Sequence, residues 1–258
     1  MKAYADGKIQ VQQQGPVTTV IINRPEVRNA LDNDAARGLG RAMRDFDADD
    51  SQAVAVLSGA GGAFCAGADL KQVAGSSDYV AWAGDPDGPT NPTLSKPVIA
   101  AVEGHAVAGG LGIALWCDIR IVDETTVFGV FCRRWGVPMS DGTTVRLPRL
   151  IGAARDLDML ITGRGVNADE AIDWGLATRR AAKGQTRQVA EELALQIAGF
   201  PQIAMRSDRM SAYKQAGQTM EDAVRTEKEL SQEAKAIEAS EGAARFATGA
   251  GRHGEFSE

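Results

Sequence analysis

Two glycine-rich turns hold the groups in this chain that are best placed for chemistry. They span residues 63–70 (AFCAGADL) and 106–112 (AVAGGLG), and each follows an apolar run and precedes a stretch compatible with a helix. Helix starts carry unpaired N–H groups and the positive end of the helix dipole, so two of them can bind one anion without an ionisable side chain. We therefore predict an oxyanion hole, a pair of backbone N–H groups that stabilises an enolate or a tetrahedral oxyanion.

Alternating strands and helices are predicted around these turns. Apolar residues recur at helical spacing in some segments and form short buried runs in others, and Gly15-Pro16 predicts a hairpin turn between the first two strands. Strands that alternate with helices are typical of an α/β fold with parallel pairing. The expected strands are 9–13, 17–22, 53–57, 98–102 and 119–122, and the expected helices are 32–49 and 109–116.

Two segments differ in composition from this alternating part. Residues 74–96 are rich in Gly, Asp, Pro and Ser, with Tyr79 and Trp82 as their only aromatic residues, which predicts a mobile loop on the substrate side. The last part of the chain is predicted to form charged, amphipathic helices. We therefore divide the chain into a core at 1–185 and a helical region at 186–258.

Composition excludes several classes of partner. With 258 residues, 44% of them hydrophobic, the chain can bury a sizeable core. Its net charge of -6, without a cluster of basic and aromatic residues, argues against nucleic acid. We find no secretory signal and no apolar run near the roughly 20 residues that span a bilayer, so we expect a cytoplasmic protein without a membrane partner. Its 3 cysteines and 2 histidines lack the spacing of zinc ligands, which predicts reduced thiols and no metal site.

Four motifs follow one another along the chain, and their order is informative. They are NRPEVRNAL at 23–31, FCAGADL at 64–70, AGG at 108–110 with CDIR at 117–120, and RLPRLIG at 146–152. In this order they resemble the first CoA-contacting segment, the two oxyanion loops and the helix after the catalytic loop of the enoyl-CoA hydratase/isomerase, or crotonase, family. The resemblance covers nearly the whole chain. It implies an α/β, crotonase-like fold of ββα superhelical turns with a C-terminal helical region.

The resemblance also implies a ligand and an assembly. The substrate would be an acyl-CoA, with coenzyme A as part of the substrate and no separate cofactor, and the N–H groups of Ala66 and Gly109 would bind the thioester oxygen. Family members commonly form trimers, so we expect a homotrimer or a dimer of trimers in which 186–258 helps to close a neighbour's pocket. The Asp69 side chain is expected to cap the helix that follows it. The residues implied to contact CoA are Arg28, Ala30, Ala66, Gly67, Ala68, Asp69 and Leu70.

The residues with which hydratases of this family position water are absent. Those enzymes hold water between two glutamates, and the corresponding positions are Gly112 and Cys132 here. Neither a glycine nor a neutral thiol replaces a carboxylate in proton transfer. The nearest carboxylate is Asp141, in a loop where isomerase and dehalogenase branches of the family place a working one. Its alternative role is to cap the helix predicted near Thr143.

Several interpretations of the chemistry stay open. The leading one is an enoyl-CoA hydratase/isomerase-like enzyme, a lyase or isomerase, with Asp141 as acid/base. A CoA thioester hydrolase or dehalogenase and a non-catalytic acyl-CoA binder are alternatives, because both glutamates are missing. Cys132 as a nucleophile and His105 as an acid/base are further alternatives. The glycines at 110 and 112 partly match a dinucleotide-binding fingerprint, although the acid at 123 follows too soon.

Overall fold

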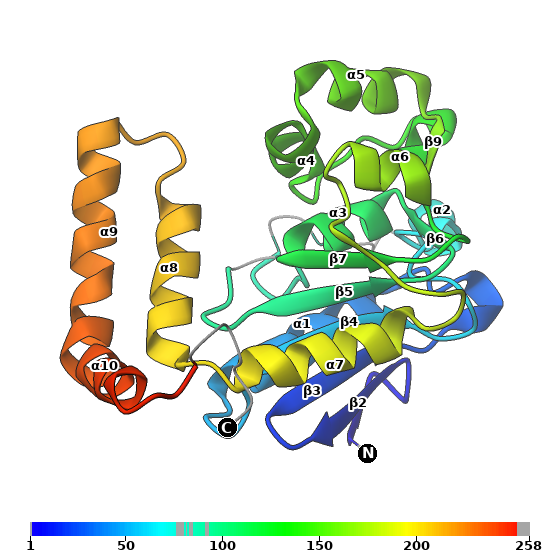
Figure 1. The fold of residues 1–258 in the computed structure, drawn as a ribbon. Helices are drawn as coiled ribbons and strands as arrows, with labels where there is room; N and C mark the ends of the chain where they lie inside the picture. The colour runs from blue at the N-terminus through cyan, green and yellow to red at the C-terminus, as the bar shows by residue number, and fades with distance from the viewer. Residues whose placement is uncertain (1, 76–79, 81, 83–84, 91–92, 252–258) are drawn as a thin grey trace. The chain divides into compact units, whose positions relative to one another are not determined.

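The computed structural model describes residues 2–75, 80, 82, 85–90 and 93–251 of the chain (Figure 1). The chain forms two compact units, Met1–Ile197 and Ala198–Glu258. The first unit extends beyond residue 185, where the sequence analysis ended the core, because α7 (Thr186–Ala198) packs on the main sheet. The roles expected of the C-terminal region in assembly and pocket closure remain predictions.

The main sheet has seven strands in the order β1-β2-β3-β4-β5-β7-β10. β1, β2 and β3 pair antiparallel, whereas each pair from β3 to β10 is parallel. The predicted hairpin and the predicted parallel pairing are therefore confirmed. The strands are β1 (Lys2–Tyr4), β2 (Ile9–Gln14), β3 (Val17–Ile22), β4 (Val54–Gly59), β5 (Val98–Val102), β7 (Ile119–Val122) and β10 (Arg179–Arg180).

Helices cover both faces of this sheet. Val20 of β3 packs into the same core as Leu39 of α1 (Asn33–Ala48). The Thr19 hydroxyl, one residue earlier, donates to the Glu191 carboxylate of α7 at an O···O distance of 2.8 Å. Because successive side chains of a strand point to opposite faces, α1 and α7 lie on opposite sides of the sheet (Figure 1). β3 is accordingly buried along its whole length.

A second sheet, of three strands, holds the glycine-rich turn at 106–112. β6 (His105–Val107) runs parallel to β8 (Val127–Gly129), which pairs antiparallel with β9 (Gly165–Asn167). The chain passes from β6 directly into α3 (Gly109–Trp116), whose predicted bounds are confirmed. The sequence analysis did not predict this sheet, because strands of three residues are too short to produce a periodic pattern.

Side-chain caps fix where α1 and α6 begin. Asp32 caps α1 as its Oδ1 accepts a hydrogen bond from the Ala35 N–H at 2.8 Å, and Asn167 caps α6 in the same way through the Glu170 N–H at 3.0 Å. The remaining helical elements of the first unit are η1 (Pro25–Val27), α2 (Leu70–Gly75), η2 (Phe131–Trp135), α4 (Thr143–Ile151), α5 (Ala153–Thr162) and α6 (Ala168–Asp173).

The second unit consists of packed helices. The Glu238 carboxylate accepts hydrogen bonds from the N–H groups of Ile203 and Ala204, at 3.0 and 2.8 Å, and so caps the start of α8 from another part of the unit. In the part of the chain that the structure describes, no helix has both the length and the apolar character needed to cross a bilayer. The elements are α8 (Gln202–Lys214), α9 (Met220–Ala234), η3 (Lys235–Ala239) and α10 (Ser240–Ala247).

Candidate active site

The two glycine-rich turns lie against each other at the start of α3. The Cys65 N–H donates to the His105 carbonyl at 2.9 Å, and the Val107 N–H donates to the Cys65 carbonyl at 3.0 Å, so the first turn pairs with β6. Gly67 has a φ of 94°, and a Cβ atom there would lie 2.8 Å from the Gly109 nitrogen. Glycine at 67 therefore permits a close approach of the first turn to the N-terminus of α3.

One of the two expected donors is engaged elsewhere. The Ala66 N–H donates to the Arg28 carbonyl at 3.0 Å, on the side of the turn away from β6. An N–H group that is already paired with a backbone carbonyl does not point into an anion site. The prediction that Ala66 supplies an oxyanion donor is therefore wrong, although Ala66 does line the cavity described below.

Ala68, two residues later, has the geometry that Ala66 lacks. It forms a parallel bridge with Leu31, in which the Leu31 N–H donates to the Gly67 carbonyl at 2.8 Å and the Asp69 N–H donates to the Leu31 carbonyl at 2.9 Å. Because backbone groups alternate along an extended segment, the N–H of Ala68 itself points away from Leu31. The sequence did not reveal this donor, because the direction of the Ala68 N–H is set by the long-range pairing with Leu31, which leaves no local sequence pattern.

Ala68 and Gly109 together form a candidate anion site. Gly109 is the first residue of α3, so its N–H has no partner within the helix. Among the described residues, neither the Ala68 N–H nor the Gly109 N–H has a hydrogen-bond acceptor. Both residues line one cavity of about 120 Å³. The same cavity is also lined by Phe131, Cys132, Trp135, Val137, Met139 and Asp141.

Asp141 brings a carboxylate into this cavity. The residue is only 7% exposed, and its Oδ1 accepts a hydrogen bond from the Thr143 N–H at 3.0 Å, so the predicted helix-capping contact is present. Arg146 donates to the Asp141 carbonyl at 2.9 Å and so holds the loop. Burial raises the pKa of the Asp141 carboxyl above its ordinary value, and the hydrogen bond from Thr143 opposes this only in part.

Gly112 lies directly behind the Asp141 carboxylate. A Cβ atom built on Gly112 would be 2.7 Å from Oδ1 and would overlap Oδ2. The space that a side chain at 112 would need is therefore filled by Asp141. Gly112 and Cys132, which correspond to the two glutamates of family hydratases, thus have different roles here. Gly112 makes room for another carboxylate, while Cys132 forms part of the cavity wall.

The alternative reactive side chains have environments that disfavour them. Burial, and next the nearby charge of Asp141, raises the pKa of the Cys132 thiol, whose Sγ lies 3.1 Å from the Met139 Sδ. A thiol with a raised pKa stays protonated and is a poor nucleophile. The His105 ring packs edge-on against Phe131, with ring centroids 6.5 Å apart, and His105 is not among the described residues that line the cavity.

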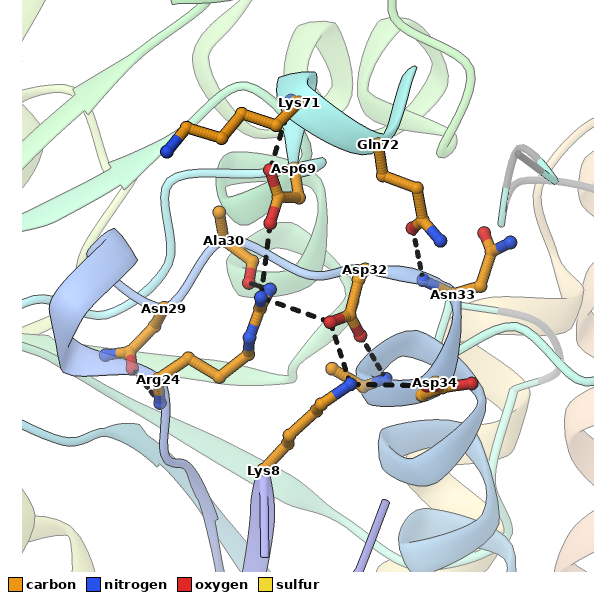
Figure 2. Close-up of polar contacts among 11 residues, drawn as sticks. Lys8, Arg24, Asn29, Ala30, Asp32, Asn33, Asp34, Asp69, Lys71 and Gln72 are labelled. Carbon is orange, nitrogen blue, oxygen red and sulfur yellow. Dashed lines mark hydrogen bonds and ion pairs between the residues drawn. The ribbon is translucent and has the colours of Figure 1, made fainter. Parts of the chain in front are cut away.

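The segments expected to hold CoA are joined through Arg24 (Figure 2). The Arg24 Nη2 lies 3.1 Å from Asp69 Oδ2 and 3.1 Å from Asp32 Oδ2, and Nη1 donates to the Ala30 carbonyl. The Arg24 side chain is only 12% exposed, which strengthens these contacts relative to surface ion pairs. Arg24 therefore fixes the segment around Ala30 against the segment that starts α2, a function that the sequence analysis missed.

Asp69 has two tasks in this arrangement. Its Oδ1 accepts a hydrogen bond from the Lys71 N–H at 3.1 Å, which confirms the predicted cap, while Oδ2 pairs with Arg24. Arg28 and Lys71 are exposed, so both guanidinium and ammonium groups are accessible to an anion. Buried Asn29, with a φ of 59°, ties the segment down by donating to the Ala60 and Ala63 carbonyls at 2.8 and 2.6 Å.

The glycines that partly matched a dinucleotide fingerprint serve internal packing. A Cβ atom on Gly110 would overlap the Cys65 carbonyl, and one on Gly112 would overlap Asp141. These glycines therefore allow protein groups to approach α3, whereas the fingerprint requires them to admit a nucleotide phosphate.

The chain is similar to known proteins over most of its length. Residues 12–250 match the family model described as enoyl-CoA hydratase/isomerase. The chain is 35% identical over 249 residues to a probable enoyl-CoA hydratase of Rhizobium meliloti, covering 95% of this chain and 96% of that protein. It is 36% identical over 201 residues to a carnitinyl-CoA dehydratase of Proteus mirabilis, covering 76% of this chain and 77% of that protein. The crystal structure of an enoyl-CoA hydratase from Mycobacterium tuberculosis superposes with a TM-score of 0.88 at 31% identity, covering 93% of this chain and 96% of that one.

Proposed function

The chain belongs to the enoyl-CoA hydratase/isomerase family and has the crotonase fold, and from this premise we propose that it is an enzyme that stabilises the enolate of an acyl-CoA thioester. The donors would be the N–H groups of Ala68 and Gly109. The observation that carries the proposal is that both groups lack an acceptor among the described residues and border the cavity that Asp141 also lines.

The two donors would act where negative charge develops. Removal of a proton next to a thioester carbonyl moves charge onto its oxygen, and donors fixed beforehand stabilise that charge without reorganising. Each such donor contributes about 2.7–4 kcal/mol to transition-state stabilisation. Because both are backbone groups held by the pairing of the first turn and by α3, their positions do not depend on a flexible side chain.

Asp141 would move the proton. Its raised pKa brings the carboxyl closer to the operating pH, which is where a general acid/base works best. It is the one carboxylate among the described residues that line the cavity. A single acid/base favours removal and return of a proton along the acyl chain, as in isomerisation, over the two-glutamate hydration that Gly112 and Cys132 do not support.

Coenzyme A would lie along the two segments that Arg24 joins. The contacts we propose are with Arg28, Ala30 and the stretch 66–70, in which Ala66 keeps a binding role although it is not a donor. Exposed Arg28 would meet a phosphate group of CoA. For the assembly we propose a homotrimer or a dimer of trimers, in which 186–258 helps to close a neighbouring pocket.

A panel of enoyl-CoA esters tests this function. We expect isomerised or hydrated product from the unmodified chain and a loss of about 10²–10⁴-fold in kcat/KM for Asp141→Asn. Release of free CoA or halide without such product would favour a hydrolase or dehalogenase. Tight binding of acyl-CoA with no turnover of any ester would favour a non-catalytic binder, and full activity of Asp141→Asn would remove the acid/base role.

A further inference from the structure

Trp82 occupies a position that the proposed chemistry does not use. It comes from the 74–96 segment that the sequence analysis expected on the substrate side, yet it is only 7% exposed. It lines the same cavity as Ala68 and Gly109. A Cβ atom on Gly109 would lie 2.5 Å from the Trp82 Cζ2 and 3.0 Å from its Cη2. The six-membered edge of the indole therefore lies against the residue that carries one of the two donors.

Described residues close to Trp82 in the sequence make contacts with it and with α1. The Asp85 N–H donates to the Trp82 carbonyl at 3.3 Å. Further along, the Arg44 Nη2 of α1 pairs with the Asp87 carboxylate at 3.1 Å, and a Cβ atom on Gly40 of α1 would overlap the Asp87 carbonyl. Glycine at 40 thus lets the segment lie close to α1, which supports the position of the indole.

The size of the cavity sets how much acyl chain it admits. Its volume is about 120 Å³. An apolar cavity of about 150 Å³ holds one benzene molecule, so this one has room for roughly five carbon atoms. Phe131, Val137 and Met139 line the cavity together with Trp82 and offer apolar surface to those carbons. The thioester carbonyl must lie at the Ala68 and Gly109 donors, so these carbons include it.

We propose that Trp82 closes the acyl-binding space and makes the enzyme selective for short acyl groups, of about four to six carbon atoms including the thioester carbon. The inference rests on the proposed acyl-CoA function and adds the substrate class to it. Removing the indole should open the space beside Gly109, so that longer acyl chains enter without displacing the thioester from its donors.

The test measures binding, so that its outcome is separate from that of the reaction. Dissociation constants of saturated thioesters, from acetyl-CoA to decanoyl-CoA, are measured by isothermal titration calorimetry for the unmodified chain and for Trp82→Ala. Trp174→Ala is the matched control, because the Trp174 ring contacts the Arg155 and Arg164 guanidinium groups and Trp174 is not among the described residues that line the cavity. Thermal unfolding of each variant establishes that it is folded.

For the unmodified chain we expect affinity to rise about fourfold per methylene up to hexanoyl-CoA. Decanoyl-CoA should bind about tenfold more weakly than hexanoyl-CoA, because it overfills the space. Trp82→Ala should move the strongest binding to octanoyl-CoA or longer, whereas Trp174→Ala should keep the original profile. If Trp82→Ala does not fold, Trp82→Phe carries the test with a smaller shift in the same direction.

Two results would overturn the inference. One is equal binding of hexanoyl-CoA and decanoyl-CoA by the unmodified chain, and the other is an unchanged chain-length profile in a folded Trp82 variant. Acyl-CoA thioesters that bind no more tightly than free CoA would overturn the inference together with the proposed ligand. If binding follows the predicted chain-length profile but no enoyl-CoA ester is turned over, only the proposed reaction is overturned.

Discussion

The Asp141 carboxylate lies in the space into which a side chain at position 112 would project, with Oδ1 2.7 Å from the point where a Gly112 Cβ would be. A missing side chain on α3 and a carboxylate from the loop between η2 and α4 are therefore two parts of one arrangement. Gly112 allows Asp141 to reach the cavity, and Asp141 fills the volume that Gly112 leaves.

Replacing Gly112 by alanine should disturb catalysis and stability together. The added methyl group collides with the Asp141 carboxylate, and inserting a carbon into a filled site costs about 1–3 kcal/mol. We expect kcat/KM to fall at least about tenfold, as judged from enoyl-CoA turnover, and urea unfolding to report the loss of stability. Gly75→Ala is the control, since a Cβ atom there meets no atom of the described residues within 4 Å. Equal activity of both variants would contradict the arrangement.

The pH dependence of activity should follow the Asp141 carboxyl. As the proposed base it must be ionised, and its pKa is raised above the ordinary 3.8 by burial. We therefore expect kcat/KM to rise with pH through that raised pKa and then level off. The profile of Asp141→Asn should be low and flat. An acid limb that persists in Asp141→Asn belongs to another group.

The same carboxyl should lower stability at neutral pH. At pH values between the ordinary pKa of 3.8 and the raised pKa, the folded state binds more protons than the unfolded chain. The free energy of unfolding therefore falls as pH rises through that interval and stays lower above it. Asp141→Asn does not titrate. The stability of Asp141→Asn relative to the unmodified chain should therefore increase from about pH 4 to about pH 7, as measured by urea unfolding at each pH. A difference that is constant with pH would show that the pKa is not raised.

The contribution of the Gly109 N–H can be isolated by comparing two substitutions. Proline removes the N–H and is tolerated at the first position of a helix, while alanine keeps the N–H and introduces the same Cβ contact with Trp82. We expect Gly109→Pro to have a kcat about 10²–10³-fold below that of Gly109→Ala. Similar rates for the two variants would exclude Gly109 as a donor.

Arg24 should matter for both stability and CoA affinity. Arg24→Ala leaves Asp32 and Asp69 without their shared, largely buried partner, and we expect a loss of about 1–3 kcal/mol in urea unfolding. Calorimetry should show weaker CoA binding, because the segments around Ala30 and Asp69 lose their side-chain link and keep only the backbone hydrogen bonds of the Leu31–Ala68 bridge and of Ala66. Lys2→Ala is the control, since its ion pair with Asp45 is mostly exposed and should cost less than about 1 kcal/mol.

Elements with long apolar runs were predictable from the sequence, whereas short pairings were not. The bounds of β5 agree with expectation because its apolar run lies between Pro97 and Glu103, and α3 begins where the glycine-rich turn predicted a helix start. β6, of three residues, has no such pattern and is defined by its neighbours. The choice between Ala66 and Ala68 depended on the bridge to Leu31, which is a long-range contact. The motif thus located the turn, and only the tertiary pairing identified the donor.

The proposed proton carrier and the proposed charge-stabilising amides belong to separate parts of the chain. Gly109 starts a buried helix, whereas Asp141 is held by Thr143 and Arg146 in the connection that leads into α4. Lengthening or shortening that connection would relocate the carboxyl group within the proposed acyl site while leaving the proposed anion-binding amides in place. One scaffold of this kind can therefore acquire a new reaction by altering a loop without rebuilding the part of the site that lowers the barrier.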